Sequence, residues 1–485
     1  MDETRNIQKK VFAGLIWKFS ERMAAQLVSL LVSIILARLL DPEDYGVVAI
    51  IMVFITIADV FVSNGFGNAL IQKKNADNLD FSSVFYINIG ISLVLYSILF
   101  VSAPVIASFY EMPILTSTLR VLGIRIPVAA VNTVQQAYVS REMLFKRFFW
   151  STLSGTMVSG LIGIMMAYHG YGVWALVVQY LSNTCINTLV LWVTLRWRPV
   201  LHCSWRRAKS LLDYGWKLLV SGLLDTGYKQ LRSLIIGKTY TESDLAFYNQ
   251  GEKYPNLIAV NINASISGVI FPALSKYQDD RMRIKQMTRR AIQVSAYIMW
   301  PMMLGLGVIA EPLINLVLTE KWLPCIPYLR IFCISYGLWP IHTANLQAMN
   351  ALGRSDLFLK LEVIKKSIGI IILLFSMGIS PLAMAYSMIL SDIASVFINA
   401  APNKKLLQYN YIEQFHDLLP PLFMSAVMAI LIYPIVFLRL NPIVIMIMQI
   451  VIGMTIYLLE SILLKNPGFI YLTTFFKKRR KHHHV

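Results

Sequence analysis

Mostly apolar stretches of about twenty residues or more follow one another along almost the whole chain, and they constrain its fold more than any other feature. Residues 442–463, for example, contain Glu460 as their only charged residue. A helix needs about 20 such residues to cross the hydrocarbon core of a bilayer. Charged residues form only 14% of the 485 residues, against about 25% in soluble proteins. We therefore predict an all-α integral membrane protein.

Gly, Pro and charge clusters divide these stretches into about fourteen predicted transmembrane helices. Their approximate limits are 12–38, 44–66, 82–107, 115–138, 150–168, 172–195, 211–237, 245–274, 288–309, 324–351, 357–377, 381–402, 417–438 and 442–463. An even number of spans places both termini on the same side of the membrane.

The basic residues indicate which side that is. Lys and Arg in short loops mark the cytoplasmic face of a membrane protein. Most of those outside the predicted spans lie on the side of the termini, so we expect both termini to be cytoplasmic. The net charge of +18 then reflects loops over anionic lipid headgroups and does not indicate nucleic-acid binding. The basic residues on the opposite side are Arg38, Lys238, Lys321 and Arg439.

Two sequence patterns return in the second half of the chain. Leu119-Arg120-Val121 returns as Leu329-Arg330-Ile331, and Trp17-Lys18 returns as Trp216-Lys217. Each half then holds six spans, which predicts two pseudo-symmetric six-helix bundles related by an axis along the membrane normal. The predicted domains are an N-terminal bundle (1–200), a C-terminal bundle (201–405), two additional transmembrane helices (406–465) and a basic cytoplasmic tail (466–485).

Ionisable residues within the spans are the candidates for function, because a charge in hydrocarbon is costly and normally faces a wet cavity or an opposite charge. They gather on single faces of the first, fourth, seventh and eighth spans; Arg125, Asn132 and Gln136, for example, share an arc of about 40°. We expect these faces to line a cleft between the bundles that receives an anion. The predicted substrate-binding residues are Lys18, Arg22, Arg125, Lys217, Lys229, Arg232, Lys253 and Arg330.

Asp225, Glu252 and Asn256 are predicted to be further polar residues of this cavity, with the acids as candidates for ion coupling. The alternative interpretation is that the charges form internal salt bridges, such as Asp225 with Lys229 at i,i+4. The basic residues without an obvious partner in the sequence are Arg22, Arg125, Lys217, Arg232 and Arg330.

Catalytic and metal-binding motifs are absent from the sequence. It contains no G-x-x-x-x-G-K-[ST] and no H-E-x-x-H motif, and its four cysteines lack metal spacing. We therefore predict a protein that is not an enzyme and that binds neither a metal nor a cofactor.

Several motifs resemble the Wzx-type polysaccharide flippases of the multidrug, oligosaccharidyl-lipid and polysaccharide exporter (MOP) superfamily. The most specific is Ile-Leu-Ala-Arg-Leu-Leu-Asp-Pro-Glu-Asp-Tyr-Gly at residues 35–46, and Asn-Gly-Phe-Gly-Asn-Ala-Leu-Ile-Gln-Lys-Lys follows at 64–74. Within this family, the motifs resemble those of the colanic acid exporter subgroup. The other matching segments are 140–145, 271–280, 320–322 and 350–356.

The resemblance implies a MATE/MOP-like fold and a function in the bacterial inner membrane. It implies translocation of an undecaprenyl-diphosphate-linked oligosaccharide, an O-antigen or exopolysaccharide repeat unit, to the outer leaflet by alternating access. The expected partners are this lipid-linked oligosaccharide, membrane lipids, H⁺ or Na⁺ as coupling ion, and a polysaccharide polymerase or glycosyltransferases.

Two other functions are less consistent with the sequence. A MATE-like ion-coupled drug antiporter would require acidic residues to dominate the cavity, whereas basic residues outnumber acidic ones in these spans. A membrane glycosyltransferase or polymerase would require an acidic catalytic cluster or a large loop, and the sequence contains neither.

Overall fold

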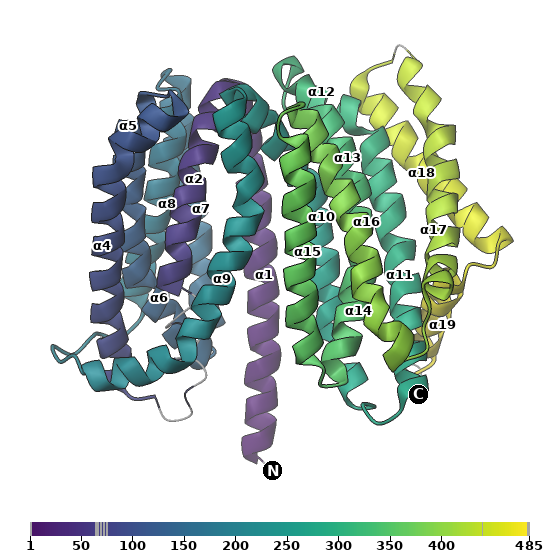
Figure 1. Cartoon of the computed structure of the whole chain (residues 1–485), viewed down its shortest axis with the longest axis horizontal. Helices are drawn as coiled ribbons and strands as arrows, with labels where there is room; N and C mark the ends of the chain where they lie inside the picture. Colours follow the sequence, from purple (N-terminus) through teal and green to yellow (C-terminus); the bar gives the residue numbers. More distant parts are fainter. Residues whose placement is uncertain are drawn as a thin grey trace. The chain divides into compact units, whose positions relative to one another are not determined.

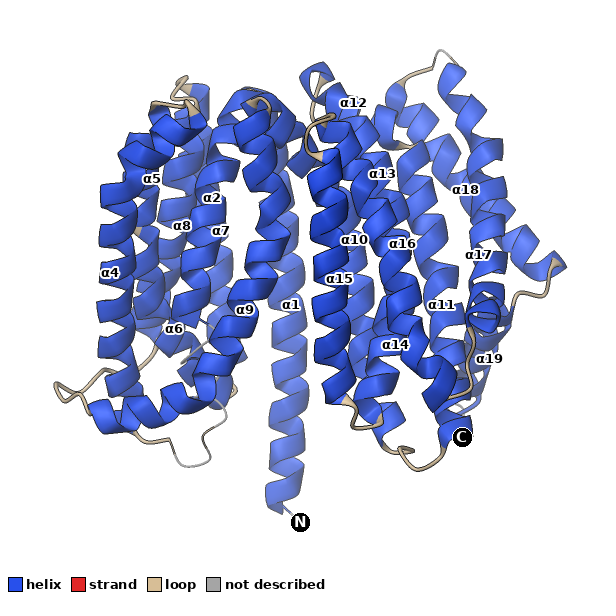
Figure 2. Ribbon diagram, viewed as in Figure 1, coloured by secondary structure: helices blue, strands red, loops and turns tan. Residues whose placement is uncertain are grey.

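The computed structural model describes residues 2–63, 67, 70, 73, 76–438 and 440–482, and their side chains except 2–16, 18, 19, 208, 210–214, 269, 355 and 475–482. Within these ranges the chain forms helices and loops but no strand (Figure 2). It divides into two compact units, Met1–Ala246 and Phe247–Val485. The domain limits predicted from the sequence stay a prediction.

The helices of the first unit pack around buried aliphatic residues of α2 and α6. In it α7 packs against both α1 and α8, and α9 packs against α2 and α4. Its helices are α1 (Asp2–Leu39), α2 (Pro42–Ser63), α4 (Asn78–Tyr110), α5 (Ile114–Gly123), α6 (Arg125–Arg141), α7 (Phe145–Tyr168), α8 (Val173–Thr194), α9 (Trp205–Thr239) and the start of α10 (Glu242–Ser275) (Figure 1).

The second unit is built around α11, which contacts α13, α14, α17 and α19. The predicted tail at 466–485 contains a separate helix, α19, which packs against α11. The elements of this unit after α10 are α11 (Arg281–Val308), α12 (Ala310–Val317), η1 (Glu320–Cys325), α13 (Ile326–Gly337), α14 (Trp339–Ala351), α15 (Ser355–Ser376), α16 (Pro381–Leu406), α17 (Tyr411–Ile432), η2 (Tyr433–Phe437), α18 (Pro442–Leu463) and α19 (Pro467–His482).

Among the described residues, 11 helical segments are long and apolar enough to cross a membrane. The prediction of an all-α, multi-pass membrane protein is therefore confirmed, whereas the number fourteen stays a prediction. The predicted spans 211–237, 324–351 and 357–377 are missing from the eleven. The first and third lie in α9 and α15, which carry several charged residues, and the second contains polar residues such as Arg330, His342 and Gln347.

Two predicted spans, 115–138 and 324–351, are each broken into two helices. The first breaks at Ile124 between α5 and α6, and the second at Leu338 between α13 and α14. Pro127 and Pro340 lie shortly after the breaks and lack the N–H group that would continue the helical hydrogen bonds. The break at Ile124 makes Arg125 the first residue of α6.

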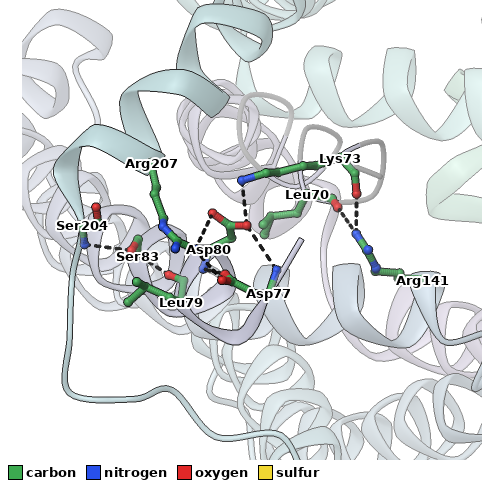
Figure 3. A network of polar contacts seen from close by, with 9 residues as sticks. All are labelled: Leu70, Lys73, Asp77, Leu79, Asp80, Ser83, Arg141, Ser204 and Arg207. Atoms are coloured by element: carbon green, nitrogen blue, oxygen red, sulfur yellow. Dashed lines mark hydrogen bonds and ion pairs between the residues drawn. The ribbon is translucent and has the colours of Figure 1, made fainter. Parts of the chain in front are cut away.

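A polar network at the start of α4 holds the start of α9 (Figure 3). Asp77 caps α4 in a reciprocal capping box with Asp80. Arg207 of α9 forms ion pairs with both acids, and the Lys73 ammonium lies 2.7 Å from Asp80. The hydrogen bond from Arg207 lowers the pKa of Asp77 to about 2. The pairing therefore stabilises the folded protein fully at pH values above the ordinary pKa of an aspartate. This contribution is lost only as the pH falls toward 2, so the network stays intact at physiological pH.

Asp80→Asn should lower the free energy of unfolding by about 1–2 kcal/mol. The change removes a fully buried negative charge that two basic groups share, although both groups are partly exposed and can be hydrated again. Unfolding in mixed micelles measures the effect. Glu142→Gln is the matched control, because Glu142 is exposed and should change stability by less than about 0.5 kcal/mol. Equal effects of the two changes would contradict the role given to Asp80.

Candidate substrate site

A polar cavity of about 270 Å³ lies within the first unit, between α2, α6 and α8. Most of its lining side chains carry amide, hydroxyl or charged groups, which are rare inside membrane helices and mark functional sites there. The lining residues are Asp59, Val62, Ser63, Arg125, Ala129, Asn132, Thr133, Gln136, Asn183, Thr184 and Asn187.

The helical repeat explains why these polar side chains meet. Arg125, Asn132 and Gln136 are spaced so that they share one face of α6, as the sequence indicated, and this face lines the cavity. Asn183 and Asn187, one turn apart on α8, line its opposite wall. Sequence reasoning missed the contribution of α8, although two amides at i,i+4 in an apolar span were a usable signal.

Arg125 is fixed by contacts on three sides. Its guanidinium lies 3.3 Å from the Asp59 carboxylate, and its Nε donates a 3.0 Å hydrogen bond to Thr184 Oγ1. Its Nη1 lies 3.9 Å from the sulfur of Met52. The sequence offered no obvious partner for Arg125, whereas the fold supplies Asp59. In the described lining, one positive charge is therefore balanced by one negative charge.

Two oxygen atoms of the cavity residues lack a hydrogen-bond partner among the described residues. Asn132 Nδ2 donates a 3.3 Å hydrogen bond to Asn187 Oδ1, which also accepts one of 2.6 Å from Ser151 Oγ. Asn132 Oδ1 and Asp59 Oδ1 are buried and unpaired. An unpaired buried acceptor costs about 1–3 kcal/mol, so both atoms favour a bound molecule that donates hydrogen bonds.

Arg232 of α9 is a second unusual group in the first unit. The residue is only 7% exposed, and its Nε and Nη2 are buried without a hydrogen-bond partner in the described part of the chain. On the same helix, Asp225 is paired with Lys229 at 2.7 Å. A buried, uncompensated guanidinium is costly and favours binding of an anion.

The other predicted basic residues of the first unit lie in more open positions. Arg22 on α1 and Lys217 on α9 are exposed, and Lys229 is exposed despite its pairing with Asp225. The side chain of Lys18 lies outside the described residues.

The predicted site residues of the second unit have local contacts. Arg330 Nε donates a 3.1 Å hydrogen bond to the carbonyl of Gly307, and its guanidinium lies 6.0 Å from the centre of the Tyr433 ring. On α10, Glu252 accepts a hydrogen bond from the Tyr336 hydroxyl, while Lys253 and Asn256 are partly exposed. The cleft predicted between the two bundles stays a prediction.

Within the residues that the structure describes, no group of three His, Cys, Asp or Glu side chains could hold a metal ion. The geometry instead offers a polar cavity that contains an Arg–Asp pair and, on α9, a buried guanidinium. Together with the eleven apolar helices, these features define a multi-pass helical membrane protein with buried polar and charged groups.

The family follows from the sequence match. Residues 35–327, more than half of the chain, match the family described as "Polysaccharide biosynthesis protein". The chain belongs to this family.

Individual relatives agree with this assignment. The chain is 26% identical over 305 residues to the succinoglycan biosynthesis transport protein ExoT of Rhizobium meliloti, covering 63% of this chain and 62% of that protein. It is 23% identical over 362 residues to the lipopolysaccharide biosynthesis protein WzxC of Escherichia coli, covering 74% of each. The match to ExoT thus spans less than two thirds of that relative.

Solved structures have the same fold. Lipid II flippase MurJ in an inward closed conformation is similar with a TM-score of 0.74 and 17% identity, over 93% of this chain and 99% of that one. An inward-facing multidrug resistance MATE family transporter of the MOP superfamily has a TM-score of 0.64 and 16% identity, over 81% and 98%. These likenesses confirm the predicted MATE/MOP-like fold.

Proposed function

We propose that this protein is a flippase that moves an undecaprenyl-diphosphate-linked oligosaccharide from the cytoplasmic to the outer leaflet of the bacterial inner membrane. The family supports a role in polysaccharide biosynthesis, and the names of two similar proteins include transport and flippase functions. In this proposal both termini are cytoplasmic, and the protein itself catalyses no covalent step.

One observation carries the proposal: Arg232 of α9 is buried, and its Nε and Nη2 have no hydrogen-bond partner among the described residues. A diphosphate supplies several charged acceptor oxygens, which form strong hydrogen bonds with guanidinium donors. Binding of the lipid headgroup would compensate the buried charge. The exposed Arg22 and Lys217 would attract the same headgroup before it reaches Arg232.

The driving force follows from the charge of the substrate. Moving negative charge outward is favoured by an inside-negative potential, by about 2.3 kcal/mol per charge per 100 mV. Coupling to H⁺ or Na⁺ would use Asp225 or Glu252, which bond to Lys229 and Tyr336 respectively. A polymerase and glycosyltransferases of the same pathway would consume and supply the substrate.

The MATE-like antiporter is less well supported. A cationic drug or coupling ion needs an acidic residue that is available to it. In the first unit, Asp59 of α2 and Asp225 of α9 are each within ion-pair distance of a basic residue, Arg125 and Lys229 respectively.

Deletion of the gene in its host should eliminate the surface glycan and leave the lipid-linked oligosaccharide in the cytoplasmic leaflet. Plasmid copies of the wild type and of Lys217→Arg should restore export, whereas Lys217→Glu and Arg22→Glu should reduce it at least tenfold, because they repel the diphosphate. Glycan immunoblots measure export, and membrane protein levels control for folding. Normal surface glycan in the deletion strain would contradict the proposed function; normal export by both reversed variants would exclude those two residues only.

A further inference from the structure

The cavity between α2, α6 and α8 differs from the Arg232 position in its charge balance, and this difference suggests separate roles. We propose that the cavity binds the hydroxyl groups of one neutral sugar residue of the transported glycan, while the diphosphate binds at Arg232. The inference rests on the proposed function and identifies which part of the substrate this cavity holds.

Charge argues against an anion in the cavity. Among the described lining residues Arg125 is the only basic one, and the Asp59 carboxylate lies 3.3 Å from it. A diphosphate bound to Arg125 would therefore approach a carboxylate of like charge in a medium of low dielectric constant. A cation is disfavoured in the same way by Arg125. The balanced pair leaves a neutral polar solute as the best match.

The unsatisfied atoms of the cavity favour a ligand that donates hydrogen bonds. Asp59 Oδ1 and Asn132 Oδ1, the buried lining atoms with no hydrogen-bond partner among the described residues, are both acceptors. A fully ionised diphosphate has acceptor oxygens only and cannot satisfy them. A sugar hydroxyl donates one hydrogen bond and accepts others, so it can bond to these oxygens and also receive hydrogen bonds from amide groups of the lining.

The size of the cavity limits how much of a glycan enters it. Its volume of about 270 Å³ lies just below the usual range for ligand pockets, which begins at about 300 Å³. A cavity of this size suits one sugar ring and is too small for an oligosaccharide. The exposed Gln136 belongs to the lining, so the remaining sugars can extend past it.

The polar groups are held in position before a ligand arrives. Arg125 is fixed by Asp59 and Thr184, and Asn187 accepts a 2.6 Å hydrogen bond from Ser151. Such preorganisation reduces the entropy lost on binding. Because the contacts come from three helices, a sugar bound here would bridge α2, α6 and α8.

A binding experiment on the full chain in nanodiscs tests the proposal. The probes are undecaprenyl diphosphate and the lipid-linked oligosaccharide extracted from the producing strain. The wild type should bind the glycan-bearing lipid about tenfold more tightly than the bare lipid, the contribution of one or two additional hydrogen bonds. Asn132→Leu and Gln136→Leu should reduce this ratio toward one without changing affinity for the bare lipid. Gln136 is exposed, so its variant should fold.

Two further variants separate the inference from the proposed function. Gln278→Leu, the same exchange at an exposed position of the second unit, should leave the ratio unchanged. Arg232→Met should weaken binding of both lipids by the same factor. If neither Asn132→Leu nor Gln136→Leu changes the ratio, or if both lipids weaken equally, the cavity holds only water and the inference is overturned. Equal wild-type affinities would also overturn it, whereas binding of neither lipid would contradict the proposed function itself.

Discussion

Arg232→Met is expected to stabilise the folded protein by about 2 kcal/mol and to reduce glycan export at least tenfold. Two nitrogens of the buried guanidinium have no hydrogen-bond partner in the part of the chain that the structure describes, and an apolar side chain of similar length removes this buried charge. The same change removes the donors proposed to bind the diphosphate. Most substitutions destabilise a protein, so a gain in stability with a loss of transport is a distinctive result.

Unfolding in mixed micelles and export in the deletion strain measure these two effects. Arg206→Met is the matched control, because Arg206 lies on the same helix but is exposed, and we expect little change in either measurement. A less stable Arg232→Met protein would indicate that Arg232 has a structural partner. Unchanged export would remove Arg232 from the diphosphate site.

Arg125→Leu should lower the free energy of unfolding by about 2–3 kcal/mol, because it leaves the Asp59 carboxylate without its counter-charge in a membrane helix. This loss of stability is smaller than for a fully buried pair, because the side chains of Arg125 and Asp59 are 23% and 28% exposed. Asp59→Leu should have a similar effect by leaving Arg125 unpaired. The double variant should recover most of the wild-type stability, because no unpaired charge remains.

A double-mutant cycle on unfolding free energies measures this coupling. All three variants should reduce export, since each removes hydrogen-bonding groups from the cavity. Purely additive losses in the double variant would show that Arg125 and Asp59 do not stabilise each other.

Much of the fold could be predicted from the sequence, because a membrane requires long apolar helices and these are visible in residues such as 442–463. Breaks within helices were harder to predict. At the break, the N–H of Ile124 bonds to Val121, and Tyr96 Oη of α4 donates a hydrogen bond to the carbonyl of Arg120. Such a contact depends on how neighbouring helices pack. The predicted span 115–138 therefore consists of two helices.

The candidate site could be predicted only in part. Helical spacing grouped Arg125, Asn132 and Gln136 correctly, because such spacing depends on one helix alone. The partner of Arg125 could not be found in this way, since Asp59 lies on a different helix. Likewise Arg330 bonds to a backbone carbonyl of α11, a contact that depends on how helices pack.

Translocation in proteoliposomes tests the central claim most directly. Purified wild-type protein would be reconstituted in vesicles with the extracted lipid-linked oligosaccharide in both leaflets, under a membrane potential. A membrane-impermeant lectin or glycosidase then reports the fraction on the outer surface over time. We predict that the wild type moves the lipid-linked oligosaccharide of the inner leaflet, which is protected from the probe, to the accessible outer leaflet. Folded Arg232→Met should do so at least tenfold more slowly. A protected fraction that stays unchanged with folded, correctly inserted wild-type protein would contradict the account.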